Sequence, residues 1–450
     1  MSTLFTRAFG ALILALAYLV AVPFTGEFGF PGARVQAEES EGRQQKTRRV
    51  PTMSESTFKK LAEAQEAIDA KNFAGAKKVL EDMLARSRNL NGNEIGQVRN
   101  MMGFVYFTEE NYAAAIREYE QVVAQGEEIP EGLETTTLYT LAQLSFVEER
   151  YQDALDYMET WITKANNPGA DPHIFMGQVY YQMQNFPAAI IQIEKGIRIA
   201  QERSLDVKEQ WWALLNYLYY EQENWPKVLE ILEILVKDFP KRDYWIRLAG
   251  IHGQLGHDKE QVWAMEGAYI ADFLETEQDL MNLAGLLMQE QTPYRAALVL
   301  EKGFNDKAIE RSSKNLQALG QAWQLAQEAD KAIPAYEEAG RLSEDGRIYE
   351  RLAQLYLDVD KYQECEVASD NAIDKGGLRS VQQVYIVKGM CQYNKNQSEI
   401  PNLTAARKSF VSCRNEARKS DDDSNQRICA SWITYLDRES KRLEELAASI

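Results

Sequence analysis

The sequence has few of the residues that carry out chemistry, because only three histidines and four cysteines occur among its 450 residues. His173 follows a proline-containing turn, whereas His252 and His257 lie around a glycine-rich turn. Neither a cysteine nor a convergent carboxylate motif accompanies these histidines. We therefore expect them to have loop and packing roles, and we expect no catalytic residue, no metal site and no cofactor. A metal ion shared by His252 and His257, or a hydrolase within residues 252–265, is the weaker interpretation.

Clustered positive charge is also scarce. The formal net charge is -18, and without residues 1–37, which hold Arg7, Arg34 and Glu27, it is -19. Proteins that bind phosphate backbones need clustered Lys and Arg side chains. Nucleic acid is therefore not an expected partner, and the acidic residues along the expected helices are typical of a solvated surface.

A short apolar run lies near the N-terminus, where Arg7 precedes residues 8–22, and residues 35–37 form a small-x-small site. These are the parts of a secretory signal peptide, and the run is too short for a comfortable membrane span. We expect residues 1–37 to be a signal peptide cleaved after Ala37, which leaves no stable membrane insertion. Retention as an anchor is the alternative.

Residues 38–54 are rich in Glu, Gln, Lys and Arg and lack apolar periodicity. This composition predicts a flexible linker. The basic cluster of Lys46, Arg48 and Arg49 is expected to be solvated, with contact to an anionic lipid or partner as the alternative.

One helical pattern recurs from Ser54 onward. It consists of a large residue, a small residue three positions later and a large residue four positions after that, as in Tyr112, Ala115 and Tyr119. The spacing of the copies indicates a basic period of about 34 residues with variable loops. These copies are the expected second helices of the repeats, and they begin at Phe73, Tyr112, Tyr151, Phe186, Trp225, Lys259, Pro293, Ala329, Tyr362 and Leu403.

The first helices carry the matching half of the pattern, a small residue followed three positions later by tyrosine, as in Gly103 and Tyr106. Both halves together form the tetratricopeptide pattern. A single helix pair cannot bury its apolar face, so the pairs must stack. We expect an all-α fold, a right-handed α-solenoid of about ten helix pairs over residues 55–421, with a charged capping helix within residues 422–450.

Several segments fix loops as well as packing residues, and they are residues 129–134, 138–144, 244–250 with 253–256, 292–303 and 351–358. Residues 55–450 resemble the periplasmic tetratricopeptide proteins of Gram-negative bacteria that are associated with TonB-ExbB-ExbD energy-transduction loci. The resemblance implies a non-enzymatic periplasmic scaffold for protein–protein interactions that assists TonB-dependent outer-membrane transport, with TonB/ExbB/ExbD-type components as partners. A general scaffold for cell-envelope assembly is the alternative.

In a stacked array, the first-helix positions opposite the packing stripe line a concave groove. Aromatic and amide side chains at these positions predict a track for an extended peptide or protein partner, and packing within the core is the alternative. The groove lacks the Lys, Asn and Arg set that clamps a terminal carboxylate. The predicted partner-binding residues are Asn100, Phe104, Phe107, Tyr139, Gln143, Phe146, Ile174, Gln178, Tyr181, Tyr217 and Tyr220.

All four cysteines lie in the last quarter of the chain. Cys365 and Cys413 occupy second-helix packing positions, and Cys391 and Cys429 lie in the helices that follow. Because each second helix packs on the next first helix, we predict the disulfides Cys365–Cys391 and Cys413–Cys429 among three connectivities. Four reduced thiols used as small core residues are the alternative.

Overall fold

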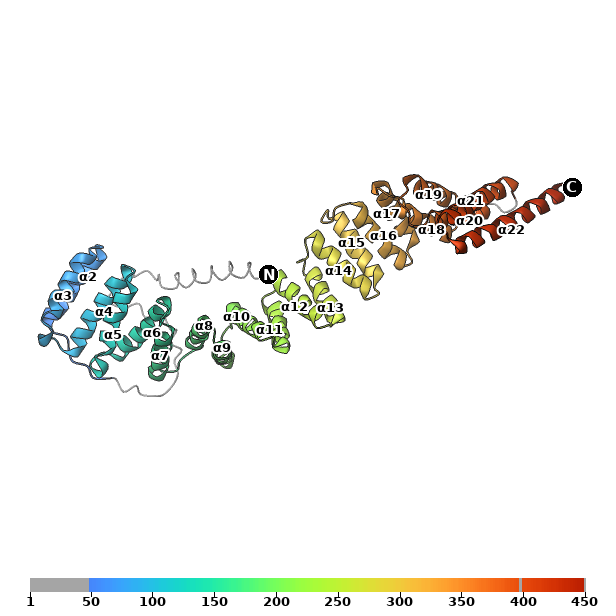
Figure 1. The fold of residues 1–450 in the computed structure, drawn as a ribbon. Helices are drawn as coiled ribbons and strands as arrows, with labels where there is room; N and C mark the ends of the chain where they lie inside the picture. Colours follow the sequence, from blue (N-terminus) through green and yellow to red (C-terminus); the bar gives the residue numbers. More distant parts are fainter. Residues whose placement is uncertain (1–47, 396–398, 449–450) are drawn as a thin grey trace. The chain divides into compact units, whose positions relative to one another are not determined.

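A computed structural model describes residues 48–395 and 399–448 (Figure 1). The predicted signal peptide and residues 38–47 of the predicted linker lie outside these ranges. Within the described residues there are twenty-one α-helices, two short 3-10 turns and no β-strand. The all-α prediction is therefore confirmed. None of the helices in these ranges is long and apolar enough to cross a membrane.

The chain divides into two compact units, one ending at Glu223 and the other beginning at Asn224. The predicted pair α10 and α11 is divided between them. The first unit contains α2 (Glu55–Asp69), α3 (Phe73–Leu84), α4 (Gly92–Thr108), α5 (Tyr112–Val123), α6 (Glu131–Val147), α7 (Tyr151–Lys164), α8 (Asp171–Gln182), α9 (Phe186–Glu202) and α10 (Glu209–Glu221), with 3-10 turns at Ser87–Asn89 and Gly126–Glu128.

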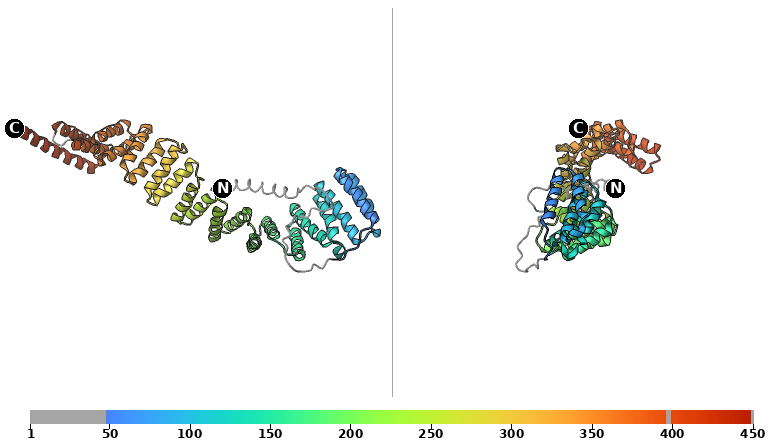
Figure 2. Two further views of the ribbon diagram at one scale, coloured as in Figure 1. Left: turned by 180° about the vertical axis from the view of Figure 1, so that it is seen from behind. Right: turned by 90° about the vertical axis from the view of Figure 1, so that its left-hand side faces the viewer.

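The second unit consists of α11, which is the second helix of the divided pair, five further helix pairs and a long last helix. Its helices are α11 (Trp225–Asp238), α12 (Arg242–Gln254), α13 (Asp258–Ile270), α14 (Glu277–Gln289), α15 (Pro293–Asn305), α16 (Ser313–Leu325), α17 (Ala329–Leu342), α18 (Arg347–Asp358), α19 (Tyr362–Lys375), α20 (Val381–Lys395), α21 (Ile400–Lys419) and α22 (Asp423–Ala448). In both units, consecutive helices pack side by side in a stack (Figure 2).

A tight turn joins the two helices of a pair. In the turn before α5, Glu110 is in the left-handed region, with a φ of 57°. Asn111 then caps the helix, because its side chain accepts a hydrogen bond from the Ala114 N–H. A residue in the left-handed region also stands two positions before many of the other second helices. The positions, with that of Glu110, are Lys71, Glu110, Glu149, Gln184, Gly256, Gln291, Gln327 and Asp360.

A small residue in the first helix of a pair receives a large side chain from the second helix. A Cβ added to Gly103 in α4 would lie 2.8 Å from the Tyr119 ring in α5, sixteen positions later. Gly320 meets Tyr336 at the same spacing and the same 2.8 Å. The helices therefore approach closely at one defined point in each pair, and the core runs along these points.

The predicted starts of two second helices need correction. The helix expected from Lys259 begins at Asp258, after His257 takes the cap position. The helix expected from Leu403 begins at Ile400, so that Pro401 stands in its first turn. Proline is tolerated in the first helical turn, because the N–H that it lacks would have no partner there.

Two disulfides tie the C-terminal helices of the second unit together. Cys365 is bonded to Cys391, which joins α19 to α20, and Cys413 is bonded to Cys429, which joins α21 to α22. These are the pairs that the sequence predicts. All four side chains are fully buried. The capping helix α22 therefore has a covalent as well as an apolar attachment to its neighbour.

Candidate binding surfaces of the first unit

The predicted groove residues occupy three equivalent positions on the first helices of this unit. Each position is counted from one buried reference residue in its helix. This residue is Gly103 in α4, Ala142 in α6, Gly177 in α8 and Asn216 in α10. The first row, three positions earlier, holds Asn100, Tyr139 and Ile174. The second row, one position later, holds Phe104, Gln143, Gln178 and Tyr217. The third row, four positions later, holds Phe107, Phe146, Tyr181 and Tyr220.

The rings of the third row pack on the start of the second helix of their own repeat. The ring centroids of Phe107 and Tyr112 are 5.8 Å apart. The same contact recurs between Phe146 and Tyr151 at 5.9 Å, and Tyr181 stacks on Phe186 at 6.1 Å. The rings before Tyr220 are half-buried, whereas Tyr220 is exposed. These rings therefore support the helix pair and also present one side to the surface.

Aromatic contacts also join neighbouring first helices. Phe146 of α6 meets Phe175 of α8 edge to face, with the ring centroids 5.8 Å apart. Tyr181 of α8 meets Tyr217 of α10 in the same way at 5.9 Å. The first contact runs into the core, because Phe175 is only 6% exposed, and the second joins two half-buried rings of the rows.

The first row lies deeper than the other two. Ile174 is only 4% exposed, and its Cδ1 is 2.7 Å from the place where a Cβ of Gly196 would stand. Ile174 therefore belongs to the core, and its assignment to a partner-binding groove needs correction. Tyr139 packs against Trp161 at 5.4 Å, and its burial, together with the charge of Asp171, raises its pKa. Asn100 is half-buried.

The second row supplies the polar groups. Gln143 and Gln178 are half-buried between the first and third rows, and Phe104 packs against the core of the first repeats. Burial and the neighbouring Glu221 carboxylate raise the pKa of Tyr217 to about 12, so its hydroxyl is uncharged at neutral pH. The rows together form an uncharged surface of rings and amides, which suits the alternating apolar and hydrogen-bonding groups of an extended peptide.

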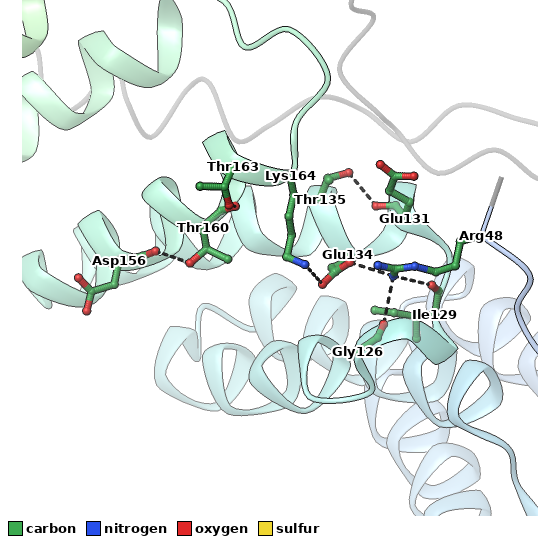
Figure 3. Close-up of polar contacts among 10 residues, drawn as sticks. All are labelled: Arg48, Gly126, Ile129, Glu131, Glu134, Thr135, Asp156, Thr160, Thr163 and Lys164. Carbon is green, nitrogen blue, oxygen red and sulfur yellow. Dashed lines mark hydrogen bonds and ion pairs between the residues drawn. The ribbon is translucent and has the colours of Figure 1, made fainter. Parts of the chain in front are cut away.

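A second surface of this unit carries a segment of the chain itself. Residues 48–54, which we call the strap, pass the N-terminal ends of α6 and α4 before α2 begins. Nη1 of Arg48 donates to the carbonyl oxygens of Gly126 and Ile129, both at 3.2 Å, and to the Glu134 carboxylate at 2.9 Å (Figure 3). Arg48 was expected to be solvated, and the sequence missed this site.

Glu134 is the centre of this contact. Its side chain, in α6, is only 5% exposed, and its second oxygen lies 2.9 Å from Nζ of Lys164 at the end of α7 (Figure 3). A buried carboxylate is costly unless charged partners compensate for the lost water. Arg48 and Lys164 provide that compensation from two different segments of the chain.

The rest of the strap is held by α4. The side-chain amides of Asn91 and Asn93 donate to the carbonyl oxygens of Thr52 and Pro51, both at 2.9 Å. Glu94 accepts a hydrogen bond from the Ser54 N–H at 2.8 Å. Burial raises the pKa of Glu94, but the hydrogen bonds from the Ser54 and Asn91 N–H groups outweigh it and lower the pKa to about 2. Residues 48–54 are therefore a bound segment and not the free linker that their composition predicts.

None of the three histidines is a member of the rows or of the strap contacts. His173 is buried in α8, with Nδ1 3.0 Å from the Gln192 amide oxygen. The Nδ1 atoms of His252 and His257 are 3.5 Å apart in the second unit, and burial followed by the charge of His257 lowers the pKa of His252. In the part of the chain that is described, no group of three or more His, Cys, Asp or Glu side chains has metal-binding geometry.

The repeated close approach sixteen residues apart and the turns before the second helices settle the fold class. The chain is a tetratricopeptide-type α-solenoid. No family model matches it, and no curated protein does. Solved structures of tetratricopeptide repeat proteins are similar to this chain, but their sequence identity to it is low. The similarity is therefore one of the helical repeat fold alone.

Three such structures illustrate the range. A tetratricopeptide repeat protein from Parabacteroides merdae is 17% identical, with 67% of this chain and 99% of that chain covered and a TM-score of 0.33. The MamA protein is 18% identical, with 41% and 95% covered and a TM-score of 0.34. YrrB, described as a TPR protein with an unusual peptide-binding site, is 9% identical, with 42% and 90% covered and a TM-score of 0.32.

Proposed function

We propose that this protein is a non-enzymatic scaffold of the periplasm that binds a protein partner on the aromatic and amide rows of its first unit. The observation that carries the proposal is the recurring half-buried ring of the third row on α4, α6 and α8, joined to α10 by the Tyr181–Tyr217 contact, with Gln143 and Gln178 in the row beside it. Rings offer a large contact area that costs little conformational entropy, and amides satisfy a peptide backbone.

The finer proposal is that the partner belongs to the TonB system and that the scaffold assists TonB-dependent transport across the outer membrane. It is supported by the sequence resemblance of residues 55–450 and by the signal-peptide pattern of residues 1–37. Cys365–Cys391 and Cys413–Cys429 fit an oxidising compartment such as the periplasm. A general scaffold for envelope assembly is the second candidate, since the same surface would serve it.

The test is site-specific photocrosslinking in cells. A benzoylphenylalanine placed at Gln143 or Gln178 should form adducts with a TonB/ExbB/ExbD-type component or an outer-membrane transporter. The matched control is Arg117, an exposed residue of the second helix α5, which should give no such adduct. These positions are preferable to Phe104 and Phe107, because both phenylalanines pack on core clusters and their loss would also affect stability.

The outcomes separate the candidates. Adducts only with envelope-assembly machinery, together with a permeability phenotype on deletion, would support the second candidate against the first. Iron or haem starvation on deletion would support the first. Equal crosslinking from Arg117 would remove the rows as the binding surface.

A further inference from the structure

The strap does not use all of the hydrogen-bonding capacity of its binding surface. Asn93 donates from Nδ2 to the Pro51 carbonyl oxygen at 2.9 Å, but its Oδ1 atom is buried and has no hydrogen-bond partner in the described residues. The Asn93 side chain belongs to a residue that is only 8% exposed, so water does not readily replace the missing donor. A buried acceptor without a donor makes the complex weaker than the site allows.

The donor is missing because the strap residue that faces Asn93 is Pro51, which has no N–H. In an extended segment, the N–H and C=O groups of one residue point to the same side, so that a facing group can exchange hydrogen bonds with both. Pro51 offers its carbonyl oxygen to Asn93 but has no N–H. A residue with an N–H in this place would bring a donor to the strand edge that faces the Asn93 amide.

The arginine contact adds selectivity to the same surface. One guanidinium nitrogen of Arg48 meets two carbonyl oxygens and one buried carboxylate. Without a cation here, the Gly126 and Ile129 carbonyl oxygens would lose the donor that Arg48 supplies. The surface therefore favours a segment that carries an arginine three residues before the residue facing Asn93.

We propose that the N-terminal edge of α4 and α6 is a second peptide-binding site, which the strap fills within the chain as a suboptimal ligand. Its preferred occupant is an extended segment of a partner protein with arginine at the place of Arg48 and a non-proline residue at the place of Pro51. This site is separate from the aromatic and amide rows, so it stands or falls independently of the proposed function.

The test uses the full chain with Arg48→Glu, which sets a carboxylate against Glu134 and releases the strap. Fluorescein-labelled, acetylated peptides of residues 46–56 are titrated with this chain, and binding is followed by fluorescence anisotropy. The peptide carrying Pro51→Val should bind the R48E chain at least tenfold more tightly than it binds the wild-type chain. It should also bind at least fivefold more tightly than the native peptide and than a peptide with N-methylvaline at this position, which lacks the N–H but has no proline ring.

Matched chain variants complete the experiment. Arg49→Glu changes a neighbouring exposed residue by the same charge and should leave peptide binding as weak as in the wild-type chain. Within the R48E chain, Glu134→Gln should weaken binding, and Asn93→Ala should abolish the preference for valine over N-methylvaline. Asn93→Ala keeps the experiment decisive if the loss of the Glu134 charge unfolds the chain, which circular dichroism would reveal.

Three results would overturn the proposal. The first is equal binding of the valine peptide to the R48E and wild-type chains. The second is equal binding of the valine and N-methylvaline peptides, because Asn93 would then not recognise the N–H. The third is a native peptide that binds as tightly as the valine peptide, since the site would then serve exchange of straps between copies of this chain.

Discussion

The two units are built from the same kind of helix pair, but they differ at the position that forms the second row in the first unit. In the first unit, the position after the small core residue holds the half-buried side chains of Gln143 and Gln178. In α12, α14, α16 and α18 of the second unit, the same position is exposed and holds Gly250, Gly285, Gln321 and Gln354, whereas Met390 at this position in α20 is half-buried. A Cβ added to Gly250 or Gly285 would meet no atom within 4 Å. The same helix pair therefore carries half-buried amides at this position in α6 and α8 and an open surface at this position in α12 to α18.

The units also differ in how their outer ends are secured. The first unit has no cysteine, and the strap ties its first helices together through Arg48, Asn91 and Asn93. The second unit has both disulfides near its C-terminal end. Terminal repeats have a neighbour on one side only and tend to fray, so each unit needs additional contacts there. The predictions below test whether these contacts act on one unit alone.

Reduction of the disulfides should have the largest effect, and it should be confined to the second unit. Each bridge closes a loop with a sequence separation of 26 or 16 residues, and its loss should cost about 2–4 kcal/mol of unfolding free energy. Hydrogen exchange followed by mass spectrometry, with and without reductant, should show lost protection in α19 to α22 and none in α2 to α9. Intact mass under non-reducing conditions must first show two bridges, and four free thiols would remove the contrast.

Filling the close approach within a helix pair should destabilise either unit to a similar degree. Gly103→Leu and Gly320→Leu each drive a side chain into a tyrosine ring that already lies within 2.8 Å of an added Cβ. We expect a loss of about 1–3 kcal/mol for each substitution. Hydrogen exchange should locate the first effect in α4 and α5 and the second in α16 and α17. A loss of protection across both units from one substitution would show that they unfold as one.

Acid should loosen the strap before it affects the disulfide-linked end. Because the pKa of Glu94 is lowered to about 2 on folding, its contribution is fully present above the unfolded pKa of about 4.5 and is lost as the pH falls towards 2. Trypsin does not work in this range, so pepsin accessibility of residues 50–56 is a suitable measure. Glu94→Gln should make this accessibility independent of pH, whereas unchanged pH dependence would assign it to another group.

The smallest effect should be of opposite sign in the two units. Gly285→Ala, in the interior of α14, adds a Cβ in open space and should stabilise the second unit by about 0.5–1 kcal/mol. Gly177→Ala in α8 should destabilise the first unit, because its Cβ would stand 2.5 Å from Cγ1 of Ile193. Thermal unfolding of the two variants beside the wild type measures the difference. Equal shifts would mean that helix propensity alone decides both.

Most of the fold can be predicted from the sequence because the same packing pattern recurs in each helix pair. Small residues such as Gly103 and their large partners such as Tyr119 appear many times at the same spacing, so weak single copies support one another. The second helices start where an asparagine or similar residue precedes an aromatic one, as at Asn111 and Tyr112. The disulfide pairs also follow from this order, since Cys365 and Cys391 lie in consecutive helices.

The surfaces are less predictable, for two physical reasons. Ile174 has the spacing of a surface residue, but Gly196 leaves space that draws it into the core. Arg48 binds main-chain oxygens of Gly126 and Ile129, which lie 78 and 81 residues further along the chain. Because every residue has a main-chain carbonyl group, no pattern of side chains in the sequence predicts such a contact. Large side chains that recur at one spacing, such as the rings of the third row, can be predicted from the sequence, whereas a contact that occurs once, such as that of the strap, cannot.

The turn between the helices of a pair has a consequence for how such a chain can diverge. Lysine, glutamate, glutamine and aspartate all occupy its left-handed position, so the turn demands a backbone conformation and tolerates many side chains. Only proline and branched residues such as valine are strongly disfavoured there. Two descendants of one ancestor can therefore lose nearly all sequence identity at these turns while their helices keep the same register. Their structural similarity will persist after their sequence similarity has been lost.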